Sequence, residues 1–204
     1  MSLQTILAIG AHPDDIELGC GGSIAKFAAA GVRVRALVLT KGEAGNRRNL
    51  DRIDETRRAL ALLGVTDFCS ADFPDTRLGD DMNTVIACIE THMAEVNPDR
   101  VYTMFEHDRH QDHRALFAAS VVACRAARQI LCYETPSSWT NFQPEMFEPI
   151  GDTLDKKVAA LTLHESQRDR PYTQPSAMRT QAQSWGQRVG VDAAEAFIAY
   201  KFVL

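Results

Sequence analysis

The sequence predicts a single α/β domain spanning residues 1–204, in which a mainly parallel sheet carries helices on both faces. Short apolar runs alternate along the chain with segments of helical periodicity, which is typical of βαβ units. Hydrophobic residues make up 45% of the chain and charged residues 24%, as in an ordinary globular domain with a sizeable core. No linker, internal repeat or low-complexity segment divides the chain, so we expect one domain.

Five short apolar runs are the expected parallel strands. The first is apolar throughout and is closed by Gly10, as expected of a strand buried on both faces. Each run is followed by a segment of the length and pattern of a helix, and right-handed connections of this kind return the chain to the same sheet. The result is a Rossmann-like arrangement. The predicted strands are residues 5–9, 32–39, 65–69, 100–104 and 129–132.

Six segments with apolar residues at helical spacing are the expected helices. Glycines at positions 31, 64 and 190 follow three of them, and Asn97-Pro98 stops another, as helix ends require. The predicted helices are residues 22–30, 50–63, 83–96, 113–127, 153–165 and 177–188.

Two regions break this alternation. Residues 134–151 contain three prolines among aromatic residues and predict an irregular loop. The tail, residues 196–204, is apolar enough to form a strand or an interface between subunits.

Composition also narrows the class of partner and the compartment. The net charge of −5 gives no reason to expect nucleic acid or an anionic membrane as a partner, so a small molecule is the better expectation. The five cysteines are an odd number and include no C-x-x-C pair, so we do not expect a disulfide framework. The first residues lack the pattern of a signal peptide, and no stretch is apolar enough to span a bilayer. These features favour the cytoplasm.

Chemistry is expected in the loops that follow strands, because ligands of open α/β sheets bind beyond the carboxyl ends of the strands. The loop after the first strand contains His12, Asp14 and Asp15, and the loop after the fourth contains His113. Two imidazoles and one carboxylate, from His12, Asp15 and His113, form a three-ligand set with an open position, as in catalytic zinc sites. Asp14, beside a ligand, is then free to act as a base.

Other interpretations remain open at this point. Asp14 and Asp15 could be helix-capping acids, with His12 bonded to the backbone. The glycine-rich segment 19–23 could bind a dinucleotide in an oxidoreductase, although its spacing differs from that motif and acidic residues precede it. Two histidines and a carboxylate also describe a non-haem iron oxygenase. A metal-stabilised binding domain without activity is a further alternative.

The two loops together resemble those of the LmbE/PIG-L family of metal-dependent de-N-acetylases. The matching segments are Ala11-His12-Pro13-Asp14-Asp15 and His110-Gln111-Asp112-His113, and weaker matches extend along nearly the whole chain. The extended first segment and Asp108-Arg109-His110 especially resemble the branch that contains the bacillithiol-pathway glucosaminyl-malate deacetylase. Residues 135–148 match no pattern of the family.

The resemblance implies a role for each matching residue. His12, Asp15 and His113 would bind Zn²⁺, with Fe²⁺ as a possible alternative, and Asp14 would be the general base for a metal-bound water. His110 would face the substrate carbonyl, and Asp112 would orient His110. Three further residues would hold the sugar, namely Arg52, Asp75 and Glu43.

The resemblance also implies a substrate, a reaction and an assembly. The protein would be a metal-dependent amide hydrolase that removes an acetyl group from an N-acetylglucosamine-type or related aminosugar conjugate. Members of this family often form trimers or hexamers, so a homo-oligomer is expected. The sugar, its aglycone and the acyl group are not specified by the motifs.

Overall fold

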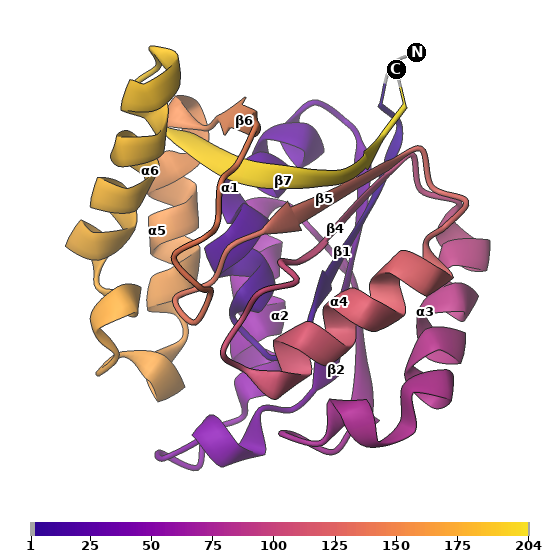
Figure 1. Cartoon of the computed structure of the whole chain (residues 1–204). Helices are drawn as coiled ribbons and strands as arrows, with labels where there is room; N and C mark the ends of the chain where they lie inside the picture. The colour runs from indigo at the N-terminus through magenta and orange to yellow at the C-terminus, as the bar shows by residue number, and fades with distance from the viewer. Residues whose placement is uncertain (1–2, 204) are drawn as a thin grey trace.

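A computed structural model describes residues 3–203, and a seven-stranded mixed sheet forms its centre (Figure 1). Met1, Ser2 and Leu204, which belong to the expected N-terminus and tail, lie outside the described residues. The strand order is β3-β2-β1-β4-β5-β7-β6, with β1 to β5 parallel and the last two strands antiparallel. The strands are β1 (Thr5–Gly10), β2 (Arg33–Thr40), β3 (Asp67–Phe73), β4 (Arg100–Met104), β5 (Gln129–Tyr133), β6 (Met146–Pro149) and β7 (Ala194–Phe202).

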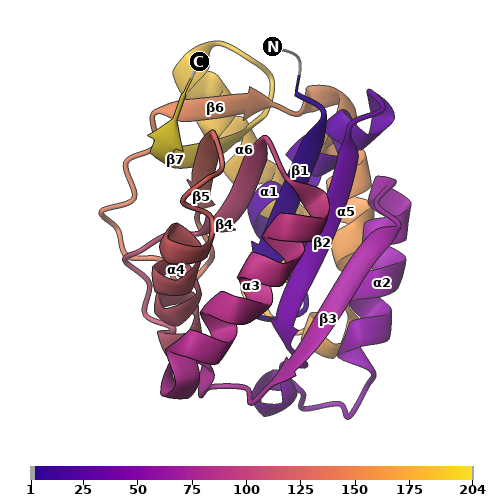
Figure 2. The ribbon, with the colours of Figure 1, turned by 90° about the vertical axis from the view of Figure 1, so that its right-hand side faces the viewer.

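Helices cover both faces of the sheet, which confirms the predicted fold class. Figures 1 and 2 show α3 and α4 on one face, and α1, α2, α5 and α6 on the other. The helices are α1 (Asp15–Ala29), α2 (Arg52–Leu63), α3 (Met82–Val96), α4 (Gln111–Ala123), α5 (Leu154–Thr162) and α6 (Pro175–Val189). Since both faces are covered, the central strands are buried on both sides, as their continuous apolar runs predict.

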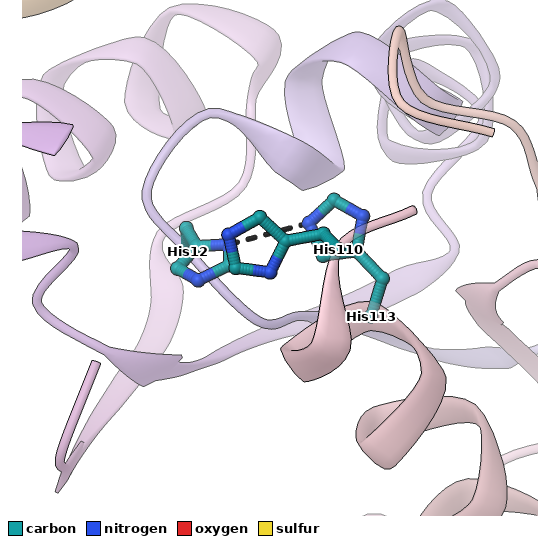
Figure 3. Close-up of side chains that lie close together, drawn as sticks. All are labelled: His12, His110 and His113. Carbon is teal, nitrogen blue, oxygen red and sulfur yellow. Dashed lines mark hydrogen bonds between the residues drawn. The ribbon is translucent and has the colours of Figure 1, made fainter. Parts of the chain in front are cut away.

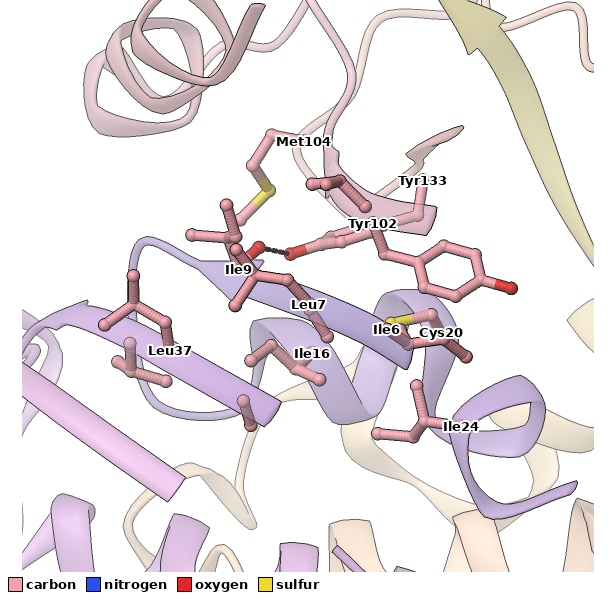
Figure 4. Close-up of a cluster of buried hydrophobic side chains, with 14 of the residues drawn as sticks. Ile6, Leu7, Ile9, Ile16, Cys20, Ile24, Leu37, Tyr102, Met104 and Tyr133 are labelled. Carbon is pink, nitrogen blue, oxygen red and sulfur yellow. Dashed lines mark hydrogen bonds between the residues drawn. The ribbon is translucent and has the colours of Figure 1, made fainter. Parts of the chain in front are cut away.

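The core is centred on β1 (Figure 4). Ile6, Leu7 and Ile9 are fully buried, and the aromatic ring of Tyr133 on β5 packs into the same cluster. The Tyr133 hydroxyl donates a hydrogen bond of 2.6 Å to the carbonyl of Ile9, which satisfies a buried polar group inside an otherwise apolar cluster. The C-terminal end of β1, where the first polar loop begins, is therefore held both by apolar packing and by the hydrogen bond from Tyr133.

Helix α1 begins seven residues earlier than predicted. It starts at Asp15 and bends at Cys20, whose backbone is not helical, so the glycine-rich segment lies within the helix. The N–H groups of Gly22 and Ser23, exposed by this bend, donate to the carboxylate of Glu195 on β7 at 2.8 and 2.7 Å. The sequence prediction placed the helix start at this internal second start, because glycines ordinarily weaken helices.

The C-terminal part differs from the prediction in its strands. Within the expected irregular loop 134–151, residues Met146–Pro149 form the edge strand β6. Among residues 3–203 its one partner strand is β7, the expected apolar tail, which enters the sheet antiparallel beside β5. The prolines concealed this strand from the sequence pattern, and an edge position is where a strand tolerates proline. No helix within residues 3–203 has the length and apolar character needed to cross a membrane.

Two neighbouring glycines of α1 provide a test of this packing. A Cβ at Gly19 would lie 2.0 Å from the Tyr133 ring, whereas a Cβ at Gly21 meets nothing closer than 3.5 Å. Since Tyr133 is fully buried and hydrogen-bonded, it cannot move away. We expect Gly19→Ala to lower the free energy of unfolding by about 1–3 kcal/mol or more. The matched Gly21→Ala should stay within roughly 0.5 kcal/mol of the parent or exceed it. Urea denaturation measures both, and equal stabilities would contradict this account.

Candidate metal and active site

The pairing of β1 with β4 brings two polar loops together. These parallel strands are neighbours at the centre of the sheet, so their carboxyl ends lie side by side. The chain leaves β1 toward β2 on one side and leaves β4 toward β5 on the other, which makes this a topological switch point with a crevice above it. Residues 11–14 follow β1, and residues 105–110 follow β4.

The first loop turns sharply into α1. Asp14 has a φ of 101°, a left-handed conformation that a non-glycine residue rarely adopts. The turn is held by the His12 N–H, which donates to Asp15 Oδ2 at 2.7 Å. Asp14 stands at the N-cap position but its side chain makes no capping hydrogen bond, so the structure does not support the capping interpretation. Strain of this kind is found where a side chain must be aimed at a site.

The side chains of the predicted ligands His12, Asp15 and His113 form a triangle in which each imidazole faces a different carboxylate oxygen of Asp15. His12 Nδ1 lies 3.3 Å from His113 Nε2 and 3.4 Å from Asp15 Oδ2. His113 Nε2 lies 3.5 Å from Asp15 Oδ1. All three side chains are at most 9% exposed. Tetrahedral Zn²⁺ with bonds of about 2.0–2.1 Å requires ligand atoms about 3.3–3.4 Å apart. The two imidazole nitrogens have this spacing, and the Asp15 carboxylate is a donor of the right type beside both of them.

His110 completes a cluster of three imidazoles at this point (Figure 3). Its ring centroid lies 4.5 Å from that of His12 and 4.7 Å from that of His113. Candidate ligand atoms of the three histidines all lie within 4.8 Å of one another, so His110 is also within reach of an ion held here. Burial, together with His12 and His113, lowers the pKa of His110, which favours its neutral form.

Asp112, which is expected to orient His110, contacts that ring through its backbone, while its carboxylate faces His12. Asp112 Oδ2 lies 3.1 Å from His12 Nε2 and accepts the N–H of Thr76, while Oδ1 accepts the N–H of Leu78. His110 is instead oriented by the Asp112 backbone, whose N–H donates to His110 Nδ1 at 3.2 Å. A carboxylate on Nε2 favours the tautomer of His12 whose Nδ1 lone pair faces the triangle.

Asp108 orients the imidazole of His113, as Asp112 orients that of His12. From the sequence, no role was assigned to Asp108. Its Oδ2 lies 3.1 Å from His113 Nδ1. The same carboxylate accepts hydrogen bonds from the hydroxyls of Thr135, Ser137 and Ser138 and from the His110 N–H. Although burial opposes it, the contact with His113 and these donors lower the pKa of Asp108. The unaligned loop after β5 is thus attached to the candidate metal ligand. The one available signal was the position of Asp108 in the same loop as His110.

The two adjacent carboxylates of the first loop differ in their electrostatics. Burial raises the pKa of Asp14 to about 6, with Arg52 opposing and Asp15 reinforcing the rise. For Asp15, burial is outweighed by His113 and His12, which lower the pKa to about 2. Asp15 is therefore the ionised partner of the imidazoles, and Asp14 is the carboxyl group that can exchange a proton near neutral pH.

The three residues expected to hold a sugar are placed differently. Arg52 is buried, donates to the carbonyls of Gly42 and Pro13 at 2.8 and 2.6 Å, and lies 3.5 Å from Asp14 Oδ1. Asp75 lies 3.2 Å from His12 Nε2. Both line the cavity described below, whereas Glu43 is exposed beside it and its neighbours Ala44 and Gly45 form the wall. A sugar contact from any of the three stays a prediction.

A cavity of about 310 Å³ opens over the triangle. Asp14, His110 and the three candidate ligands line it. Further lining residues come from the segment between α5 and α6, which the sequence pattern left without a function because two prolines interrupt it. These additional residues are Gln167, Arg170 and Tyr172.

A buried ion pair between His164 and Glu17 lies next to the site. His164, expected near a helix end, is 1% exposed, and its Nε2 lies 3.0 Å from Glu17 Oε1 on α1. Burial alone would lower the pKa of His164, but Glu17 outweighs it and the pKa is raised. The pair links the segment after α5 to the helix that begins at Asp15.

An α/β sheet with a candidate His/Asp metal site at its switch point is typical of metal-dependent enzymes, and comparison with known proteins specifies the family. Residues 7–124, more than half of the chain, match the PIG-L family, described as GlcNAc-PI de-N-acetylase. The chain belongs to this family, which confirms both the predicted resemblance and the expected class, amide hydrolases acting on non-peptide C–N bonds.

Individual relatives agree with this assignment. The chain is 47% identical over 167 residues to the "Uncharacterized deacetylase YaiS" of Escherichia coli K12, covering 79% of this chain and 90% of the relative. It is 30% identical to the "Probable N-acetyl-alpha-D-glucosaminyl L-malate deacetylase 2" of Bacillus cereus, covering 79% and 83%. The crystal structure of the conserved protein TT1542 from Thermus thermophilus superposes with a TM-score of 0.87 at 29% identity, covering 100% and 97%.

The dinucleotide alternative is not favoured. The glycines that suggested it lie inside α1, where Gly19 faces Tyr133 and Gly22 faces Ile150. A phosphate cradle would instead need free backbone N–H groups at the end of β1, where Asp14 and Asp15 stand.

Removal of the Asp108 carboxylate tests its contact with His113. We expect Asp108→Asn to weaken Zn²⁺ binding about 10–100-fold. The neutral amide lacks the negative charge with which the Asp108 carboxylate orients the His113 imidazole. Competition against a fluorescent chelator measures the affinity. The control is Asp155→Asn, an exposed aspartate on α5, which should bind Zn²⁺ like the parent. Parental Zn²⁺ affinity in Asp108→Asn would exclude this role.

Proposed function

We propose that this protein is a metal-dependent deacetylase that hydrolyses the acetamide of a small N-acetylglucosamine-type conjugate. One observation carries the proposal: the ligand triangle of His12, Asp15 and His113 shares a cavity with Asp14, a buried carboxyl group outside that triangle. Hydrolysis needs both parts, whereas an iron oxygenase has no use for a base at this position. Membership of the PIG-L family supports the same reaction.

The metal would be held by His12, Asp15 and His113. When bound, a divalent ion supplies a Lewis acid for the amide carbonyl and lowers the pKa of a water molecule from 15.7 to about 7. Two imidazoles and a carboxylate accept both Zn²⁺ and Fe²⁺, so we propose Zn²⁺ with Fe²⁺ as the alternative. Asp112 and Asp108 keep the two imidazoles in the orientation and tautomer that this role requires.

Asp14 moves the proton. It accepts the proton of the attacking water as the O–C bond forms, and it returns that proton to the amide nitrogen as the C–N bond breaks and acetate leaves. The Arg52 guanidinium, 3.5 Å from Asp14 Oδ1 and fixed by two backbone carbonyls, positions the carboxylate during both transfers. The left-handed backbone at Asp14 aims this side chain into the cavity beside the triangle.

His110 stabilises the negative charge that develops on the carbonyl oxygen. Its Nδ1 accepts the Asp112 N–H, which leaves Nε2 as the N–H donor of the neutral ring. The ring stacks against His113 with an interplanar angle of 23°, so the donor is held close to the triangle. A donor of this kind is typically worth about 10²–10³ in rate.

Substrate size follows from the cavity, and substrate type from the relatives. A volume of about 310 Å³ is at the small end of ligand sites and suits one sugar ring with a short substituent. The names of the family and of the Bacillus cereus relative both specify an N-acetylglucosamine unit. We therefore propose a monosaccharide conjugate as the substrate.

Asp14→Asn tests the assigned base. The variant should still bind one equivalent of Zn²⁺, because Asp14 is not in the ligand triangle, but kcat should fall about 10²–10⁴-fold. Release of free amine from methyl N-acetyl-α-D-glucosaminide measures turnover, and calorimetric titration measures the metal. Asp15→Asn is the matched comparison and should lose tight Zn²⁺ binding. Near-parental turnover by Asp14→Asn would show that another group is the base.

Metal removal separates a hydrolase from an oxygenase. Dialysis against a strong chelator should abolish deacetylation, and stoichiometric Zn²⁺ should restore it in air and under nitrogen alike. The same assay of amine release serves for both atmospheres. The proposal is wrong if the metal-free protein stays active, or if restored activity needs oxygen.

A further inference from the structure

Arg170 and Tyr172 line the catalytic cavity, and the reaction proposed above uses neither of them. Both belong to the segment between α5 and α6, and both side chains are half-buried. A cation and a phenol in the wall of a small cavity are groups that recognise a ligand, so their partners within the protein decide whether they have another task.

The backbone that carries Arg170 is held firmly. The Thr173 hydroxyl donates to the carbonyls of Arg170 and Gln167 at 2.9 and 3.0 Å, which closes the segment on itself. Ser166 donates through its N–H and its hydroxyl to the buried carboxylate of Glu55 at 2.9 and 2.6 Å, which attaches the segment to α2. The wall is therefore a fixed part of the cavity.

The Arg170 guanidinium has no anionic partner among the described residues. No carboxylate of residues 3–203 lies within 4.0 Å of it. The arginines around it are engaged: Arg52 with Asp14 and two carbonyls, and Arg48 and Arg168 with Asp169. Partial burial of an unpaired charge costs free energy unless a ligand supplies the counter-ion.

The phenol of Tyr172 interacts electrostatically with both acidic and basic residues of the cavity. Burial raises the pKa of its phenol to about 12; Asp14 and Asp15 add to that rise, and Arg170 and Arg52 oppose it. The phenol is thus within electrostatic reach of the Asp14 and Asp15 carboxylates and of the Arg170 cation. It remains protonated at neutral pH and can donate a hydrogen bond.

We propose that Arg170, assisted by the Tyr172 hydroxyl, binds an oxyanion carried by the aglycone of the substrate. The shared ligand chemistry is a carboxylate or a phosphate, which the planar guanidinium can bind through two parallel N–H donors. This inference rests on the proposed function for the placement of the acetamide at the His12, Asp15 and His113 end. The sugar ring then spans the cavity past Tyr172 and directs its substituent to Arg170.

Three aminosugars that differ in charge test this assignment. They are methyl N-acetyl-α-D-glucosaminide, the carboxymethyl glycoside of the same sugar, and N-acetyl-α-D-glucosamine 1-phosphate. For each, kcat and KM are measured by amine release, and Kd by calorimetry, on the Zn²⁺-loaded parent, Arg170→Ala, Arg170→Lys and the neighbouring control Arg168→Ala. Arg168 is exposed and does not line the cavity.

We expect the parent to prefer one or both anionic compounds, and the better of the two identifies carboxylate or phosphate as the natural group. In Arg170→Ala the ratio of anionic to neutral kcat/KM should fall about 10–100-fold, mainly through KM, because a charged hydrogen bond is lost. Arg170→Lys should recover part of the ratio, and Arg168→Ala should keep it.

Two results would overturn the proposal: a parent enzyme without preference for either anion, or an Arg170→Ala variant that weakens all three compounds equally. If the parent hydrolyses none of them, the proposed function fails, but the calorimetric Kd values still test Arg170. Weaker binding of the anions alone in Arg170→Ala supports the oxyanion site, and unchanged binding excludes it.

Discussion

The pairing of β1 with β4 is the constraint on which the site depends. These strands align Ile6 with Arg100 and Ala8 with Tyr102, so the loops that follow them must meet. Residues that follow one strand then contact and orient residues that follow the other. His12 of the first loop is oriented by Asp112 at the start of α4, while His113 of α4 completes the triangle with Asp15 of α1. If the two strands separated, His113 would move away from both His12 and Asp15.

The site buries several carboxylates close together, and each needs hydrogen-bond donors or cations around it. Asp14, Asp15, Asp108 and Asp112 are all at most 5% exposed, and burial of several carboxylates together is costly unless each has donors or cations. The imidazoles, Arg52 and backbone N–H groups supply these partners. A bound divalent ion adds positive charge at the triangle, so metal binding and stability of this region are coupled.

The C-terminal third of the chain holds α1 in place. Lys157 of α5 and Glu195 of β7 form an ion pair of 2.6 Å, and the same carboxylate receives N–H groups of α1 at its bend. His164 contacts Glu17, three residues beyond Asp14. Because these contacts join α5, β7 and α1, the segment carrying Arg170 is placed relative to Asp14 by rigid elements, as recognition of one ligand by both ends of a cavity requires.

The sequence by itself determined the alternation of strands and helices, the two polar loops and the candidate ligand residues that these loops bring together, because local periodicity and closely spaced motifs encode them. Tertiary structure decided the rest. The bend of α1 depends on Glu195, and the strand β6 depends on pairing with β7. The Asp112 carboxylate faces His12 because β4, which precedes α4, pairs with β1. Asp108 and Arg170 acquire their surroundings from segments distant along the chain, and contacts across such separations leave no periodic or spacing signal in one sequence.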